Sequence, residues 1–212
     1  DTIRILDIGS GTGAAVVGTL LALSDWGRCA VPVEVTSTDI NRDALAKQGE
    51  ILESLRGSLS FELIVHLRHA ELPFDLENFV LALSAIADND GKKYDLITCW
   101  KFLCEFYNVN FASAQGIIRN TLHIASRMLL PYGLCILSDV TTTDNHYEYF
   151  AMTLNREANQ HDRSPEASIR TVLPLPCARS ATACQAHSCY TQRRFVLHHR
   201  LVRNDVTKIA YR

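Results

Sequence analysis

The sequence predicts an α/β fold, a three-layer sandwich around a mostly parallel, seven-stranded sheet that ends in an antiparallel β-hairpin. Short β-rich runs alternate with longer helical patterns along the 212 residues, which is typical of a parallel sheet covered by helices. A glycine-rich turn follows the first β-rich run, and two further β-rich runs close the chain. A chain of this length can bury one core, so we expect a single domain over residues 1–212.

The first half of the chain predicts three pairs of a strand and a helix. Each strand is a short run of apolar or β-branched residues, and the helices show apolar residues on one side of a helical repeat. Asn41 precedes the second helix, where its side-chain oxygen can accept hydrogen bonds from backbone N–H groups. The predicted strands are residues 3–8, 33–38 and 61–65, and the predicted helices are residues 14–24, 42–55 and 76–87.

The second half predicts two further strands and the closing hairpin. Pro131, Tyr132 and Gly133 should end a long helix, because proline cannot continue the backbone hydrogen bonding. The Asn-Asp pair at 204–205 separates two β-rich runs and predicts the turn of the hairpin. The predicted strands are residues 94–99, 134–138, 195–202 and 206–211, with helices at 113–130 and in the polar stretch 146–159.

Composition narrows the class of protein. Hydrophobic residues make up 47% and charged residues 21% of the chain, as in soluble globular domains. No apolar run approaches the roughly 20 residues of a membrane span, so we expect no membrane partner. The seven cysteines do not resemble a secreted disulfide framework, which favours the cytoplasm or another reducing compartment. The chain starts at Asp1 rather than Met, so we expect an excerpt, with any targeting segment upstream.

Charge is distributed unevenly along the chain. Residues 1–155 hold 11 Lys and Arg against 19 Asp and Glu, whereas residues 156–212 hold 10 against 4. A basic segment can bind a phosphate backbone. An ordinary solvated surface gives the same composition, and the sequence leaves both interpretations open.

The most informative segment is the turn after the first strand, Asp7-Ile-Gly-Ser-Gly-Thr-Gly13. Its glycines permit positive φ and let the backbone approach a ligand, and the next helix adds N–H groups at its N-terminus. Glycines alone would also suit nicotinamide or flavin binding. The Gly-x-Gly-x-Gly spacing and the preceding Asp7 resemble instead the first motif of class I S-adenosylmethionine-dependent methyltransferases. The predicted element order also resembles their Rossmann-like fold.

That resemblance covers essentially the whole chain and implies S-adenosyl-L-methionine as the cofactor and methyl transfer as the activity. In the family, the residue matching Asp7 lies near the amino-acid end of the cofactor. Asp39 ends the second strand, where an acidic side chain can accept the ribose hydroxyls, and Ile40 would cover the adenine. His69 stands where many members carry Asp, so an adenine contact and an exposed loop histidine are both open. The expected cofactor-binding residues are Asp7, Gly9, Ser10, Gly11, Thr12, Gly13, Asp39, Ile40, His69, Ala70 and Cys99.

Residues 98–107 should border the transferable methyl group, because ligands gather at the carboxyl ends of parallel strands. They lack the Asn/Asp-Pro-Pro-aromatic motif of many amino-directed nucleic-acid methyltransferases. Lys101 and Glu105 are the ionisable candidates, although such residues also cap or salt-bridge the following helix. Many transfers of this kind need only positioning, so we assign no catalytic residue. The acceptor stays open between a small molecule and RNA.

Three cysteines and a histidine fall within thirteen residues of a predicted insertion at about 174–192. Thiolates and imidazole suit zinc or an iron–sulfur cluster, but the spacing is not that of paired Cys-x-x-Cys knuckles, and surface or packed thiols are the alternative. Cys104 could supply a fourth ligand in place of the histidine. The candidate metal ligands are Cys177, Cys184, Cys189 and His187.

The same segment carries a second resemblance. Pro176-Cys177, Cys184 and the run from Cys189 to Arg193 are similar to the methyltransferase-like proteins that assemble the mitochondrial ribosomal small subunit and to their bacterial relatives. This resemblance implies an alternative function. The protein would then be a catalytically silent factor that binds the cofactor, a metal, and ribosomal RNA or a ribosomal subunit.

Overall fold

Strands and helices alternate along the chain through β5 in the predicted order. The computed structural model describes residues 1–27, 30–88, 91–109, 111–141, 150–165, 170–173, 192–197 and 200–211. The strands are β1 (Ile3–Ile8), β2 (Val33–Asp39), β3 (Leu63–His69), β4 (Tyr94–Trp100), β5 (Leu129–Thr141), β6 (Arg170–Leu173), β7 (Gln192–Leu197) and β8 (Arg200–Tyr211). The helices are α1 (Ala14–Asp25), α2 (Arg42–Leu55), α3 (Leu76–Asp88), α4 (Leu103–Val109), α5 (Phe111–Met128) and α6 (Phe150–Arg163), with a short 3-10 turn at Arg56–Ser58.

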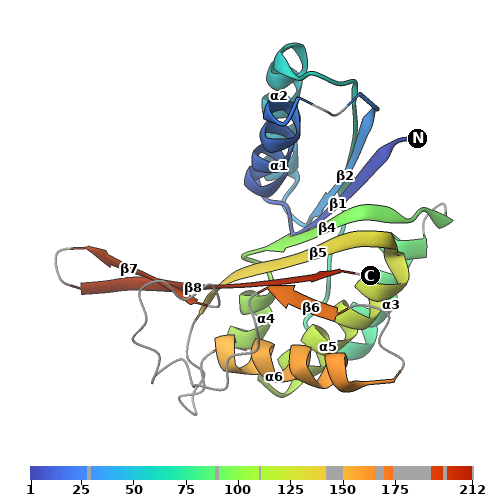
Figure 1. Cartoon of the computed structure of the whole chain (residues 1–212). Coiled ribbons are helices and arrows are strands. Elements are labelled where there is room, and N and C mark those ends of the chain that lie inside the picture. The colour runs from blue at the N-terminus through green and yellow to red at the C-terminus, as the bar shows by residue number, and fades with distance from the viewer. Residues whose placement is uncertain are drawn as a thin grey trace.

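One sheet holds all eight strands, in the order β3-β2-β1-β4-β5-β8-β6 with β7 paired to β8 (Figure 1). Strands β1 to β5 are parallel, and β8 runs antiparallel to β5. The prediction of a mostly parallel α/β sandwich that closes with antiparallel strands is therefore confirmed. The sheet has one strand more than predicted, because the four-residue β6 also pairs with β8.

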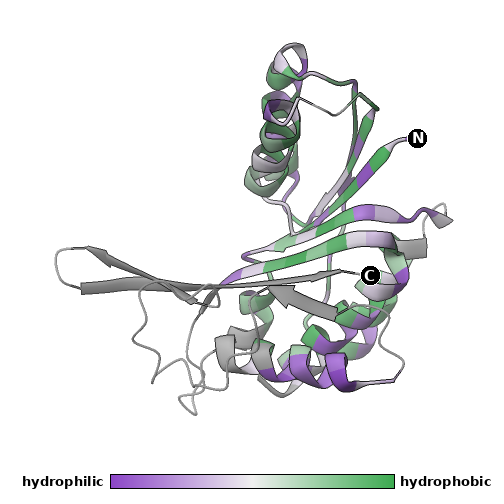
Figure 2. Cartoon of the chain, in the orientation of Figure 1, coloured by the Kyte–Doolittle hydropathy of each residue, from purple (hydrophilic) through white to green (hydrophobic). Residues whose placement is uncertain are grey.

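Helices cover both faces of the sheet. Helices α1 and α2 bury their apolar side against β1, β2 and β3, and α3 to α6 lie on the other face (Figure 1). Apolar residues dominate β5 and the middle of β4 (Figure 2), as expected for strands buried on both faces. The first core contains Ile5, Val16, Leu20, Val35, Leu52 and Leu63, and the second contains Leu6, Phe79, Ile97, Phe106, Ile117 and Leu154.

Two segments that were predicted to be turns lie inside strands. Pro131, Tyr132 and Gly133 do not separate helix from strand, because α5 ends at Met128 and β5 begins at once. They form a bulge inside β5, where the pairing with β4 changes register and Tyr132 takes a φ of 69°. The extra residues of a bulge are tolerated within a paired strand.

The hairpin also turns at a different place. Arg203, Asn204 and Asp205 lie within β8 and pair with β7, so they do not form the turn. Strand β8 pairs on both sides, with β5 along its second half and with β7 along its first. Ladder hydrogen bonds on two sides outweigh the local turn preference of Asn-Asp.

Other sequence predictions concern smaller features. The Asn41 side chain accepts hydrogen bonds from the N–H groups of Asp43 and Ala44, which confirms the predicted helix cap. Helix α4 was not predicted, because seven residues are too few to show a helical repeat. None of the helices in the described part of the chain is long and apolar enough to cross a membrane. The predicted cysteine insertion lies outside the described residues.

An ion pair between the exposed Arg119 and the buried Glu157 joins α5 to α6. Glu157 is only 1% exposed, and one of its carboxylate oxygens accepts hydrogen bonds from Nε and Nη2 of Arg119 at 3.0 and 2.9 Å. Replacing Arg119 by Met should lower the free energy of unfolding by about 1–3 kcal/mol, because it removes both donors to Oε2 of a buried carboxylate. The other oxygen, Oε1, keeps its ion pair with Arg156 at 3.7 Å. Urea denaturation measures the change. Arg127→Met, an exposed position on the same helix, is the control, and an equal loss in both variants would contradict this role.

Candidate functional site

A cavity of about 610 Å³ opens at the carboxyl ends of β1, β2, β3 and β4. Strands β1 and β4 are neighbours, but the chain leaves β1 toward β2 and leaves β4 toward β5. Open parallel sheets bind ligands at such a reversal of strand order. The volume falls within the usual range for small-molecule and cofactor sites.

The glycine-rich loop after β1 forms one wall. Gly9, Gly11 and Gly13 have φ values of 67°, 53° and 83°, which favour glycine. A Cβ on Gly9 would lie 2.5 Å from the ring of Phe102, and one on Gly13 would lie 2.6 Å from the side chain of Gln48. A Cβ on Gly11 would meet nothing within 4 Å. Packing therefore requires glycine at positions 9 and 13, whereas the backbone at Gly11 is open to the cavity.

Gln48 holds this loop against α2. Its side chain is fully buried, and its Oε1 accepts a hydrogen bond from the Ser10 hydroxyl at 2.9 Å. Its Nε2 donates to the Ser37 hydroxyl at 2.8 Å. Gln48 was not predicted, because a single glutamine within a helix carries no motif.

Asp39 joins the loops that follow β1 and β2. Its Oδ2 accepts a hydrogen bond from the Gly11 N–H at 2.7 Å, and its Oδ1 accepts one from the Asn41 N–H at 2.8 Å. A carboxylate has about four lone-pair sites, so two remain for a ligand in the cavity that Asp39 lines. The arrangement suits a ligand with two neighbouring hydroxyl groups.

Asp7 lies at the end of β1 and is fully buried. The Thr98 hydroxyl donates to its Oδ1 at 2.6 Å. Its Oδ2 has no hydrogen-bond partner among the described residues. Burial raises the pKa of Asp7 to about 7, an effect that the Thr98 hydrogen bond opposes and the nearby charge of Asp39 reinforces. A buried carboxyl with an unpartnered oxygen is chemically suited to receive a positively charged donor.

The structure brings many of the predicted cofactor-binding residues together, but not all of them. Gly13 caps helix α1, and Asp7 and Cys99 are buried in the sheet without lining the cavity. His69 is exposed at the end of β3 and also does not line it. The predicted residues that form the cavity wall are Gly9, Ser10, Gly11, Thr12, Asp39, Ile40 and Ala70.

The opposite wall is largely aromatic and was only partly anticipated. Phe106 is buried, with its ring centroid 5.1 Å from that of Phe74 and 4.9 Å from that of Phe102. Phe74 and Trp100 line the cavity but remain 49% and 48% exposed. Half-exposed aromatic side chains around a cavity mark a surface that a ligand can cover. The Pro-Phe after β3 and the aromatic residues after β4 were the available sequence signals.

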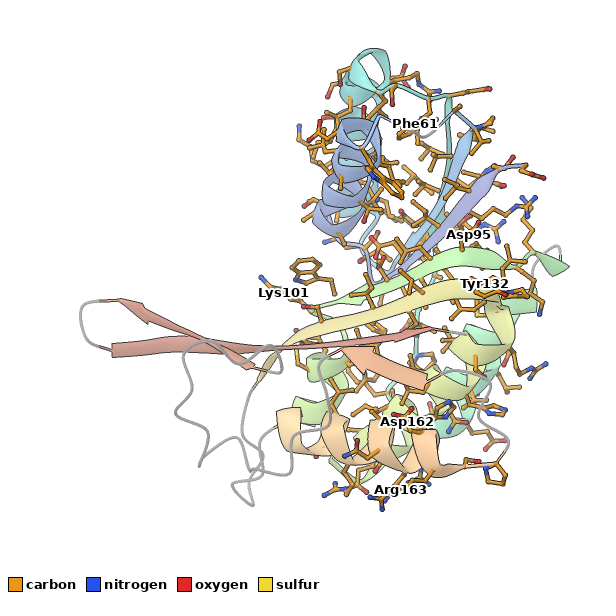
Figure 3. The ribbon with its side chains drawn as sticks, in the orientation of Figure 1. Phe61, Asp95, Lys101, Tyr132, Asp162 and Arg163 are labelled. Atoms are coloured by element: carbon orange, nitrogen blue, oxygen red, sulfur yellow. The ribbon has the colours of Figure 1, made fainter. Side chains whose placement is uncertain are left out.

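Charged side chains at the cavity are mainly acidic. Asp39, Glu71 and Glu105 line it together with one basic residue, Lys101. Lys101 has a φ of 55°, which is uncommon outside glycine, and its N–H donates to the Ser138 carbonyl at 2.8 Å. In Figure 3, its side chain leaves the end of β4 and points away from the sheet.

The described cysteines are buried thiols. Burial raises the pKa of Cys99, Cys104 and Cys135, the last to about 12, so all three stay protonated near neutral pH. The Cys104 N–H donates to the Asp139 carboxylate at 2.9 Å. No three His, Cys, Asp or Glu side chains within the described ranges are grouped so as to hold a metal ion. The predicted metal site at Cys177, Cys184, Cys189 and His187 lies in residues 174–191, outside the described residues, and stays a prediction.

Comparison with known proteins gives one family match. The family described as a methyltransferase domain matches residues 1–195. No curated relative matches the sequence. Solved structures with a similar fold include the CMeT domain of the citrinin polyketide synthase, at 22% identity and a TM-score of 0.42 over 68% of this chain and 30% of that one.

Two further structures match nearly the whole chain. TrmN from Thermus thermophilus is 14% identical with a TM-score of 0.47, over 97% of this chain and 43% of that one. A SAM-dependent methyltransferase from Methanosarcina mazei is 16% identical with a TM-score of 0.44, over 99% and 92%. The chain spans less than half the length of the citrinin synthase and TrmN structures.

The raised pKa of Asp7 predicts a specific dependence of stability on pH. Between about pH 4 and 7 the unfolded state loses this proton while the folded state keeps it, so folding becomes less favourable as pH rises. The wild-type protein should therefore lose up to about 4 kcal/mol relative to Asp7→Asn across this range. Urea denaturation of both proteins at several pH values measures the difference. A difference that stays constant with pH would contradict a buried, protonated Asp7.

Proposed function

The chain belongs to the family of S-adenosylmethionine-dependent methyltransferase domains, and we propose that it binds the cofactor in the described cavity and methylates a small molecule. The observation that carries the proposal is the open backbone at Gly11, beside a carboxylate with two unused acceptor sites. We treat residues 1–212 as one domain with the cysteine insertion near its end.

The residues present fit the cofactor. Asp39 can accept both ribose hydroxyls while it keeps its bonds to the loop. Ile40 is 58% exposed beside it and offers an apolar surface to the adenine. Ala70 lines the same cavity and donates its N–H to the Asp39 carbonyl at 3.0 Å. The Gly9–Gly13 loop offers close approach and the N-terminus of α1. Asp7 lies behind the loop without lining the cavity, and its carboxylate charge would favour the ammonium group at the amino-acid end electrostatically.

The cofactor supplies a methyl group activated by a positively charged sulfur. The protein would hold the acceptor in line with that methyl group, because orientation lowers the barrier without a covalent step. The aromatic wall of Phe74, Phe102 and Phe106 would exclude water from the reacting atoms.

The charge at the cavity favours a small acceptor over RNA. Three carboxylates and one ammonium line the wall, so the local field attracts a cationic cofactor and repels phosphates. The basic residues of the chain are enriched after residue 155 instead. The alternative function, a catalytically silent and metal-binding assembly factor, depends on the cysteine cluster. That cluster lies outside the described residues, so nothing within them supports this alternative.

Gly11→Val should abolish cofactor binding. Its side chain would occupy the open space above the loop, at a φ that strains a β-branched residue. Titration calorimetry with S-adenosylhomocysteine measures binding. Gly91→Val is the matched control, since Gly91 also has a positive φ and open space around it but lies outside the cavity. Wild-type protein that binds a nicotinamide dinucleotide but neither S-adenosylmethionine nor S-adenosylhomocysteine would refute the proposed function.

Asp39→Ala should weaken cofactor binding by about 1–3 kcal/mol, because the ribose hydroxyls lose a charged acceptor. Because the substitution also releases the Gly11 N–H, the ribose role is isolated by comparing adenosine with 2′,3′-dideoxyadenosine. The wild-type protein should prefer adenosine, and the variant should not. Asp43→Ala, an exposed position in the first turn of α2, serves as control. A preference that survives in Asp39→Ala would show that this carboxylate does not hold the ribose.

A further inference from the structure

Two side chains of opposite charge line the aromatic end of the cavity. Lys101 follows β4, and Glu105 lies in the first turn of α4. Neither forms an ion pair within the part of the chain that the structure describes. Both are exposed, so a ligand in the cavity can reach them.

The backbone fixes where both side chains start. The strained φ of Lys101 is held by the hydrogen bond from its N–H to the Ser138 carbonyl on β5. Residues in sparsely populated backbone regions persist only where the surrounding structure imposes them, and they cluster at functional sites. Glu105 is fixed because its neighbours in α4, Leu103, Cys104 and Phe106, are buried. The two charges are thus presented by rigid elements.

The surface next to these charges is apolar. Phe74, Phe102, Phe106 and Trp100 line the same cavity, and Phe74 and Trp100 keep about half of their surface exposed. Phe74 follows β3, and the other three end or follow β4; among them Phe102 packs against Gly9 of the glycine loop. They provide a site for a flat apolar molecule once the cofactor occupies the other side.

We propose that Lys101 and Glu105 bind the hydroxyl group of a small aromatic or enolic acceptor, which the aromatic wall holds against the transferable methyl group. This inference rests on the proposed function and adds its substrate class. An anionic ligand is attracted by Lys101 and repelled by Glu105. A cationic ligand is attracted by Glu105 and repelled by Lys101. A neutral hydroxyl satisfies both, because it donates to the carboxylate and accepts from the ammonium.

The pair also suits the chemistry of O-methylation. The acceptor oxygen forms a bond to the methyl carbon as the carbon–sulfur bond breaks, and the electron pair of that bond returns to sulfur, which becomes a neutral thioether. The hydroxyl proton passes to the Glu105 carboxylate, and Lys101 stabilises the charge that develops on the oxygen. A phenol, with a pKa of about 10, gives up this proton more readily than an aliphatic alcohol.

Three naphthalenes test the inference on protein saturated with S-adenosylhomocysteine. Equilibrium dialysis should show that 2-naphthol binds about tenfold more tightly than 2-methylnaphthalene, which lacks the hydroxyl, and than 2-naphthoate, which is an anion. A site built for a hydroxyl discriminates against an analogue without one. Lys101→Met should remove the preference for 2-naphthol and weaken 2-naphthoate further. Glu105→Gln should strengthen binding of 2-naphthoate, because the repelling charge is gone.

The control is an exposed pair of the same residue types outside the cavity. Lys47 and Glu50 form an ion pair of 2.7 Å on α2, and Lys47→Met and Glu50→Gln should leave all three affinities unchanged. Equal binding of the three naphthalenes to wild type, or no gain for 2-naphthoate in Glu105→Gln, would overturn the inference. Protein that binds S-adenosylhomocysteine but none of the naphthalenes would overturn this inference and leave the proposed function standing. Failure to bind S-adenosylhomocysteine would overturn the proposed function itself.

Discussion

The site depends on the hydrogen bond between the Asp39 carboxylate and the Gly11 N–H. Asp39 ends β2 and Gly11 follows β1, so the bond ties together the ends of two parallel strands. The second oxygen of Asp39 accepts from Asn41, which also caps α2. One carboxylate thus orients the glycine loop and the start of α2, and it still has acceptor sites for a ligand. Its position follows from the parallel register of β1 and β2.

Near the Asp39–Gly11 hydrogen bond lies a buried polar group, Asp7, that does not favour folding by itself. Asp7 is buried with one oxygen unpartnered, and its raised pKa reflects the cost of that burial. Such a group lowers stability unless a ligand provides a donor. A cofactor with an ammonium group would relieve this cost, so binding and stability become linked. By contrast, buried Gln48 forms hydrogen bonds through both its oxygen and its nitrogen, and the buried Glu157 carboxylate accepts hydrogen bonds from Arg119.

The two sides of the cavity differ in chemistry because they come from different elements. The loops after β1 and β2 present backbone groups and the Asp39 carboxylate, which suit the polar parts of a cofactor. The segments after β3 and β4 present Phe74, Trp100 and Phe102 with one charge of each sign nearby. In the proposed function, this division separates the cofactor from an apolar acceptor. Acceptor identity is then expected to depend on residues at the ends of β3 and β4 rather than on the glycine loop.

The sequence by itself determined the order of strands and helices along the chain through β5, except for α4, together with the glycine loop and the position of Asp39 at the end of β2. Each rests on local chemistry: glycine at positive φ, a carboxylate directly after a strand, and a repeat that separates strands from helices. Tertiary structure alone decided that Cys99 and Asp7 are buried in the sheet while His69 is exposed outside the cavity. It also placed Asn204 within a strand, since β8 pairs on both sides. Burial and pairing depend on residues distant in the chain, and a local pattern does not contain them.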